Sequence, residues 1–339
     1  MSGTWQEPVW SGFPAPHDEL DEATREAKRL PRTLRTTAGE DAEQRLVFEP
    51  ALKQYQNAYR ATDPAFADPV RGDAWRAARR KALDLVLAAI AGTEWVDALV
   101  LRGSVLMSQW FGDAAREPGD LDFVVVPHTW RIEDGRTDRM LAGIAAAAQA
   151  LADARGRDEV GISARGAVVE DIWTYERVPG RRMVLPWGSP GLPGGHVQLD
   201  FVFNEELPEE PEPVELRGGA VVQAATPRLS LAWKMMWLLN DAYAQGKDLY
   251  DAVLLAERYP LPYELLHEVF RLSGEWPYPY QEYITFDNVV ELVQYVEWNH
   301  FVVEYPQYRN DEQNFVDRLV RAVAPTFAGR SEGAGPALP

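Results

Sequence analysis

The chain contains no cysteine and only five histidines among its 339 residues. The lack of cysteine excludes disulfide bonds, thiolate zinc sites and a cysteine nucleophile, and it fits a reducing compartment. The histidines are scattered without metal-ligand spacing, so we expect them to be ordinary polar or partly buried side chains. They are His17, His128, His196, His267 and His300.

Long hydrophobic runs are also missing. The longest apolar stretch, residues 83–91, is too short to cross a bilayer. Residues 1–25 carry proline, tryptophan and acidic side chains and show no apolar core of a signal peptide. We therefore expect a cytoplasmic protein with no membrane partner.

Basic side chains are outnumbered, with 34 Lys and Arg against 52 Asp and Glu, which gives a net charge of −18. Such a negative field repels nucleic acids at long range, unless basic residues gather locally. Two segments are rich in basic residues, and a solvated charged face is the alternative interpretation of both. The first holds Arg71, Arg76, Arg79, Arg80 and Lys81, and the second holds Arg155, Arg157, Arg165, Arg177, Arg181 and Arg182.

Apolar spacing predicts an α/β part followed by a helical part. We expect strands at 95–101, 120–126 and 196–204, two more within 167–185 around a turn at Pro179-Gly180, and an exposed acidic loop over 205–219. We expect helices at 46–60, 74–91, 105–111, 140–154, 226–244, 247–258, 263–273, 286–305 and 311–323. The predicted organisation is an irregular N-terminal arm (1–45), an α/β domain (46–225), a helical domain (226–328) and a disordered tail (329–339).

Gly103-Ser104 and Asp120-x-Asp122 carry the clearest chemical signal. A Gly-Ser pair that opens a helix presents backbone N–H groups and a hydroxyl to a phosphate. Two aspartates at alternate positions of a strand point to one face, where they can bind a hard cation. Either motif alone is common for structural reasons. Asp200 lies opposite the apolar face of a later strand and offers a third carboxylate.

In this order, the motifs resemble those of the AbiEii/AbiGii toxin-type nucleotidyltransferases, within the polymerase-β-like nucleotidyltransferase superfamily. The resemblance covers about residues 95–258. Its motifs are Leu101–Ser104, Arg116, Gly119–Phe123, Leu231–Lys234 and Lys247–Asp251. The chain departs from the family pattern at Arg102, where glycine is frequent, and at Lys247, where arginine is usual.

The resemblance implies a nucleotidyltransferase fold, α/β (α+β), with a small mixed twisted sheet, a C-terminal helical domain and an active site between them. It implies that Asp120, Asp122 and Asp200 are catalytic and hold Mg²⁺ or Mn²⁺. Gly103, Ser104 and Lys234 would bind the triphosphate, and Asp248 and Asp251 would contact the nucleotide or position Lys234.

Several of these residues have an alternative, structural interpretation. Without the family pattern, Lys234 reads as a surface lysine, and Lys247 with Asp251 reads as an ion pair within one helix. Trp233 and Trp237, beside Lys234, are expected to pack in a core rather than to stack on a base. Arg116 could contact phosphate or brace its loop.

The implied activity is transfer of NMP from an NTP (ATP, GTP or CTP) to an acceptor, expected to be the 3′ end of tRNA. The chain would then be the toxin of a toxin–antitoxin pair with a cognate antitoxin. The acidic composition supports an alternative in which the acceptor is a small molecule or a protein. A second alternative is a non-catalytic nucleotide-binding regulator on the same fold.

Overall fold

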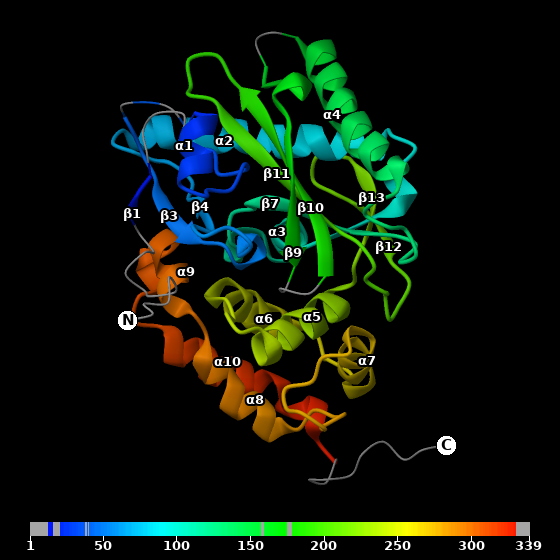
Figure 1. Ribbon diagram of the computed structural model, residues 1–339. Coiled ribbons are helices and arrows are strands. Elements are labelled where there is room, and N and C mark those ends of the chain that lie inside the picture. The colour runs from blue at the N-terminus through cyan, green and yellow to red at the C-terminus, as the bar shows by residue number, and fades with distance from the viewer. Residues whose placement is uncertain are drawn as a thin grey trace. The chain divides into compact units, whose positions relative to one another are not determined.

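The computed structural model describes residues 13–15, 21–37, 39, 41–156, 159–174 and 178–329 (Figure 1). The chain forms two compact units. The first comprises residues 1–205 and 212–224, and the second comprises residues 206–211 and 225–339. The predicted tail falls almost entirely outside the described residues.

A mixed sheet of eight strands forms the centre of the first unit. Its strands are β6 (Leu99–Arg102), β7 (Asp120–Val125), β8 (Gly161–Ile162), β9 (Val168–Thr174), β10 (Val178–Gly188), β11 (Gly195–Val202), β12 (Glu212–Glu215) and β13 (Val221–Ala224). The order is β12-β13-β6-β7-β11-β10, after which β8 and β9 pair with successive stretches of β10. Strands β7 and β11 are parallel neighbours, as are β6 and β13.

Three helices accompany this sheet: α2 (Pro69–Ala91), α3 (Ser104–Phe111) and α4 (Gly135–Arg155). Helix α2 packs against α4 and against β11. It begins where the Asp68 side chain accepts a hydrogen bond from the Val70 backbone, and it ends at Gly92. Proline at its first position has no N–H to leave unpaired, so this start is favoured by sequence.

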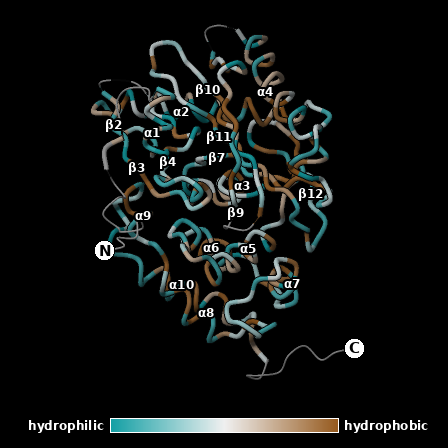
Figure 2. Tube along the Cα trace, viewed as in Figure 1, coloured by the Kyte–Doolittle hydropathy of each residue, from teal (hydrophilic) through white to brown (hydrophobic). Residues whose placement is uncertain are grey.

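The apolar side chains of β7 and β11 lie on one face of the sheet. Leu121, Phe123, Leu199 and Phe201 are fully buried, and the rings of Phe123 and Phe201 stack with centroids 5.6 Å apart. Figure 2 shows that hydrophobic residues continue along β11 and β10 of the same sheet. The polar residues between them therefore share the opposite face, as strand alternation predicts.

The described N-terminal residues are more regular than expected. They form α1 (Glu22–Ala27), a sheet of β1 (Phe13–Pro14), β3 (Arg45–Phe48) and β4 (Tyr59–Ala61), and a pair of β2 (Ala42–Glu43) with β5 (Ala65–Phe66). The helix predicted over 46–60 is wrong. Val47, Phe48 and Tyr59 are instead buried on paired strands, and Pro50 opens a single 3-10 turn between them.

Two turn predictions in the first unit are also wrong. Pro179 and Gly180 lie inside β10, paired with β9 and β11. Residues 205–219 are not loop throughout, because 212–215 form β12 against β13. In both places the partner strand overrides the local turn preference of proline and glycine.

The second unit is helical. Its helices are α5 (Pro227–Asn240), α6 (Gly246–Arg258), α7 (Tyr263–Ser273), α8 (Phe286–Leu292), α9 (Trp298–Glu304) and α10 (Glu312–Val323). Helix α6 packs against α5, α9 and α10. The single helix predicted over 286–305 is two, because the chain is extended at Val296 and the Glu297 N–H donates to the Ala244 carbonyl at 2.7 Å.

Among the described residues, no helix is long and apolar enough to span a membrane.

Candidate functional site

Strand pairing brings the three predicted aspartates together on one face of the sheet. In the parallel register of β7 and β11, Asp122 lies directly opposite Asp200, and Asp120 lies opposite Gln198. Side chains at opposed positions project to the same side of a sheet. One carboxylate oxygen from each of Asp120, Asp122 and Asp200 can be chosen so that all three lie within 4.8 Å of one another.

The donor set suits a hard divalent cation. Three carboxylates within this distance can all reach one ion at the 2.0–2.6 Å typical of Mg²⁺ and Ca²⁺ ligands. Carboxylate oxygens favour Mg²⁺ or Mn²⁺ over the metals that prefer thiolate or imidazole ligands. Asp120 and Asp122 are partly exposed, which leaves a route for an ion and a substrate, whereas Asp200 is buried.

Gly103 and Ser104 lie against these aspartates. Gly103 has a φ of +83° and forms the N-cap of α3, and a Cβ added to it would fall on Oδ2 of Asp122. The Ser104 hydroxyl donates to Oδ1 of Asp120 at 3.2 Å. The two sequence motifs therefore meet because β6, which leads into Gly103, pairs with β7.

Arg182 is a site residue that the sequence analysis did not single out. It lies on β10 opposite Asp200, and its Nε and Nη2 donate to the two Asp200 oxygens at 2.8 and 2.7 Å. Gln198 also donates to Asp200, at 3.3 Å. In the sequence Arg182 is one of six scattered arginines, and only the register of β10 with β11 distinguishes it.

The Arg182–Asp200 pair is ionised. Burial lowers the pKa of Arg182, but the carboxylates of Asp200 and Glu49 outweigh burial and raise that pKa above its usual value. Burial raises the pKa of Asp200, and Asp120 and Glu49 add to this, while Arg182 acts in the opposite direction. Because both Asp200 oxygens accept hydrogen bonds from a permanent cation, we assign the pair as carboxylate and guanidinium.

In the helical unit, the structure brings Lys234 together with Asp248 and Asp251. The Lys234 Nζ lies 2.6 Å from Asp248 and 3.1 Å from Asp251. All three side chains are buried, so the interpretation of Lys234 as a surface lysine is wrong. Trp233 and Trp237 are buried as well, which confirms their expected core packing.

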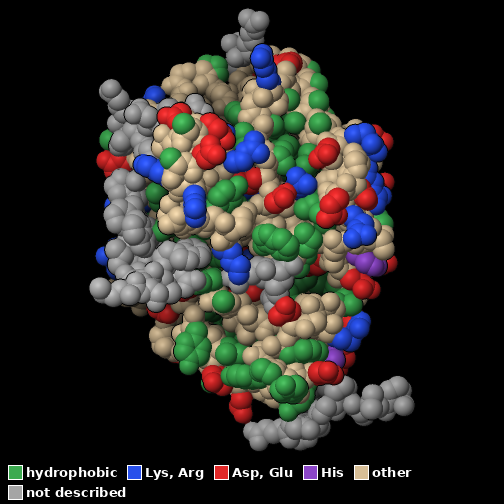
Figure 3. All heavy atoms as spheres, viewed as in Figure 1, with side chains coloured by type: hydrophobic (Ala, Val, Ile, Leu, Met, Phe, Trp, Pro, Cys, Tyr) green, Lys and Arg blue, Asp and Glu red, His purple; other side chains and the backbone are tan. Residues whose placement is uncertain are grey.

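The first basic segment is not a free cationic patch. Each of its five members contacts an acidic side chain. The alternative of a solvated charged face does not hold for Arg79, which is buried. The pairs are Arg71–Asp41, Arg76–Asp73, Arg79–Asp63, Arg80–Glu117 and Lys81–Glu159. On the face shown in Figure 3, acidic and basic side chains are likewise interspersed.

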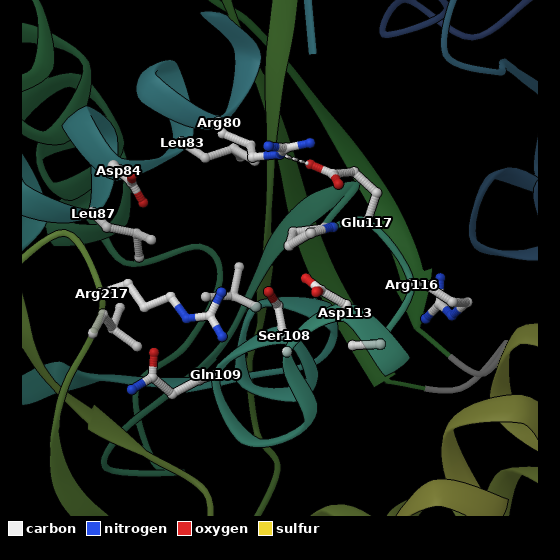
Figure 4. Close-up of a pocket in the computed structure, with 15 residues that line it drawn as sticks. Arg80, Leu83, Asp84, Leu87, Ser108, Gln109, Asp113, Arg116, Glu117 and Arg217 are labelled. Atoms are coloured by element: carbon white, nitrogen blue, oxygen red, sulfur yellow. Dashed lines mark hydrogen bonds and ion pairs between the residues drawn. The ribbon is translucent and has the colours of Figure 1, made fainter. Parts of the chain in front are cut away.

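Arg116 lines a separate cavity of about 350 Å³ in the first unit (Figure 4). Arg80 and Arg217 also line it, together with acidic and aliphatic side chains from α2, α3 and the segment before β7. Asp120, Asp122 and Asp200 are not among the lining residues. The structure thus places Arg116 in this cavity wall, within the segment that leads into Asp120.

A comparison with protein families agrees with this geometry. A family model described as nucleotidyl transferase AbiEii toxin, type IV TA system, matches residues 85–327. Among solved structures, the crystal structure of JHP933 from Helicobacter pylori is 14% identical, covers 73% of this chain and 94% of its own, and has a TM-score of 0.36. No curated protein matches the sequence.

Proposed function

The chain belongs to the AbiEii family of nucleotidyl transferase toxins, and from this premise we propose that it transfers an NMP from an NTP to the 3′ end of tRNA, dependent on Mg²⁺ or Mn²⁺. The observation that supports the proposal most directly is the cluster of Asp120, Asp122 and Asp200 beside the Gly103-Ser104 turn. Family membership makes the chain a nucleotidyltransferase of toxin type. The metal, the acceptor and a cognate antitoxin are parts of the proposal.

In this proposal Asp120, Asp122 and Asp200 hold the cation, which would neutralise charge that builds up on the triphosphate during transfer. The backbone N–H groups at Gly103 and Ser104 bind the β- and γ-phosphates. The acceptor hydroxyl oxygen bonds to the α-phosphorus as the bond to the bridging oxygen of the β-phosphate breaks and pyrophosphate leaves. Asp200 accepts the hydroxyl proton.

Lys234, Asp248 and Asp251 remain proposed nucleotide-binding residues of the helical unit. The short contacts of Lys234 with both aspartates support the version in which they position its ammonium group. Lys234 then supplies a fixed positive charge to a phosphate.

A small-molecule or protein acceptor is the second candidate. Two observations favour it: the net charge is −18, and every residue of the first basic segment is already paired with an acid. A cationic acceptor would be attracted by this field, whereas a polyanion would be repelled.

The test is transfer of label from each α-³²P NTP to total RNA, protein and metabolite fractions in the presence of Mg²⁺. We expect the wild type to label a tRNA band, and Asp122→Asn to lower transfer by about 10³-fold because it removes a charged ligand without changing shape. Asp153→Asn, on the exposed surface of α4, is the matched control and should retain full activity.

Label confined to protein or metabolites would replace tRNA with the second candidate. Undiminished transfer by Asp122→Asn would contradict the proposed role of the acidic cluster.

A further inference from the structure

Five strands of the sheet carry charged residues in one cross-strand row, which begins with Arg102 on β6 opposite Asp122 on β7. Glu170 on β9 lies opposite Arg182 on β10, Arg182 lies opposite Asp200 on β11, and Asp200 lies opposite Asp122 on β7. Arg182 is thus flanked by Glu170 and Asp200, and its hydrogen bonds go to Asp200.

Glu170 is already used by other donors. Its carboxylate accepts hydrogen bonds from the backbone N–H groups of Arg32 and Thr33, at 3.0 and 2.9 Å, and from the Tyr55 hydroxyl at 2.8 Å. The Thr33 hydroxyl donates a fourth hydrogen bond to it. A carboxylate has about four lone-pair positions, so Glu170 has none left for a guanidinium. Glu170 therefore anchors the N-terminal segment and is not an alternative partner for Arg182.

Glu49 offers Arg182 an alternative carboxylate. Its Oε2 lies 3.8 Å from Nη2 of Arg182 and 3.3 Å from Nε of Arg60, so Arg182 would share this carboxylate with Arg60. The Glu49 side chain is buried, so its attraction for Arg182 is weakly screened. Glu49 follows β3 and precedes the residues that match the family model. The second carboxylate beside Arg182 is therefore supplied by a segment outside the matched region.

A cation at the acidic cluster and Arg182 make competing demands on Asp200. Both oxygens of Asp200 accept hydrogen bonds from Arg182, and a dication next to a guanidinium is repelled by it. Nη1 of Arg182 is buried and has no hydrogen-bond partner among the described residues, so the guanidinium is not fixed on all sides.

We propose that Arg182 is a positioning residue that exchanges between Asp200 and Glu49. It neutralises Asp200 when the cluster holds no cation, and it shifts its ion pair to Glu49 when a cation takes Asp200. The proposal rests on the cation site of the proposed function. Glu49 then lowers the free-energy cost of releasing Asp200, and so the N-terminal segment sets the affinity of the site for its metal.

Two substitutions should change metal affinity in opposite directions. Arg182→Gln removes the competitor, and we expect it to tighten Mn²⁺ binding by about tenfold. Glu49→Gln removes the alternative partner, and we expect it to weaken Mn²⁺ binding by about threefold. In the double variant the effect of Glu49→Gln should disappear, because Arg182 is no longer there to be held.

The measurement is titration of the purified full chain with Mn²⁺, without nucleotide and at constant neutral pH, read by the electron paramagnetic resonance signal of free Mn²⁺. Thermal unfolding followed by circular dichroism checks that each variant is folded. Arg181→Gln is the matched control, because Arg181 is the next residue of β10 and pairs with Asp171 instead. It should leave Mn²⁺ affinity unchanged.

The outcomes separate the two proposals. If Asp122→Asn binds Mn²⁺ as the wild type does, the proposed cation site is wrong. If binding depends on Asp122 but Arg182→Gln does not tighten it, the exchange is overturned. The exchange is also overturned if Glu49→Gln still weakens Mn²⁺ binding in the double variant. The effect would then come only from the charge of Glu49 acting on the ion at a distance. If Arg182→Gln does not fold, Glu49→Gln alone decides, and unchanged Mn²⁺ affinity refutes the exchange.

Discussion

At the scale of single residues, Gly103 shows how closely backbone and carboxylates approach each other in this site. Its positive φ is unfavourable for residues with a Cβ, and the space that a Cβ would need is taken by Asp122. Glycine is required here for two separate reasons, conformation and contact.

Gly103→Ala should therefore abolish transfer. We expect a loss of at least about 100-fold, because the added methyl group displaces the Asp122 carboxylate from its position. The matched control is Gly219→Ala, which has nearly the same φ, +81°, but open space around the added atom. It should lose about 1–2 kcal/mol of stability and keep its activity. Equal activity loss in both variants would show that backbone strain, not contact with Asp122, is responsible.

His196 on β11 should make the stability of the first unit depend on pH. Burial, and then the charges of Arg35 and Arg25, lower its pKa from 6.5 to about 4. Between these values the unfolded chain binds a proton that the folded chain does not, so stability is full above pH 6.5 and falls as the pH is lowered toward 4. The loss is at most about 3 kcal/mol.

The test of this effect is urea unfolding at several pH values from 4 to 7. His196→Gln should flatten the decline over this range, whereas His128→Gln, at an exposed position, should leave it unchanged. An identical decline in wild type and His196→Gln would assign it to other groups.

The sequence predicted individual site residues only where a local pattern encodes them. Alternation along two strands is enough to place Asp120, Asp122 and Asp200 on polar faces, and the structure brings them together. Arg182 and Glu49 were not predicted, because their positions beside Asp200 depend on strand register and on a contact between distant parts of the chain.

At the scale of elements, periodicity located most helices and strands. Helix α7 has the predicted bounds, and α2, α6 and α10 have the predicted ends, because capping residues, glycine and proline mark these limits. The predictions were wrong where contacts with distant segments determine the secondary structure. Residues 46–60 have helical spacing but pair as strands, and 286–305 is broken by a backbone contact with Ala244.

The pairing of α5 with α6 through Lys234 should contribute strongly to the stability of the helical unit. Lys234→Met leaves Asp248 and Asp251 buried without their cation, and we expect a loss of about 3–5 kcal/mol. Lys247→Met, at a half-buried position in the first turn of α6, is the control and should cost less than about 0.5 kcal/mol. Chemical unfolding followed by circular dichroism measures the stability of both variants. Equal stability would contradict a structural role for Lys234, Asp248 and Asp251.

At the scale of the whole molecule, acidic residues outnumber basic ones and give a net charge of −18. Many acidic side chains form ion pairs with arginine, including those that contact the first basic segment. Arg102, which stands where the family frequently has glycine, forms a further pair with Glu205. In the acidic cluster three carboxylates lie close together, and one of them, Asp200, is paired with the buried Arg182.

Cation binding should therefore stabilise the protein as a whole. Addition of Mg²⁺ or Mn²⁺ at about 100 times its dissociation constant should add about 2.7 kcal/mol to the folded state, seen as a rise in the unfolding temperature. EDTA should reverse this rise, and Asp122→Asn should show none. A rise of the same size in Asp122→Asn would place the responsible cation elsewhere.

The anchoring of the N-terminal segment on Glu170 bears on how this protein could have evolved. The segment lies before the family-matched residues, yet its backbone satisfies a buried carboxylate on β9, within the matched region. A lineage that lost the segment would leave Glu170 without these donors, and one that lost Glu170 would remove an attachment point of the segment. Natural selection would therefore keep the two as one heritable unit, and relatives without the extension should carry a different residue at this position of β9.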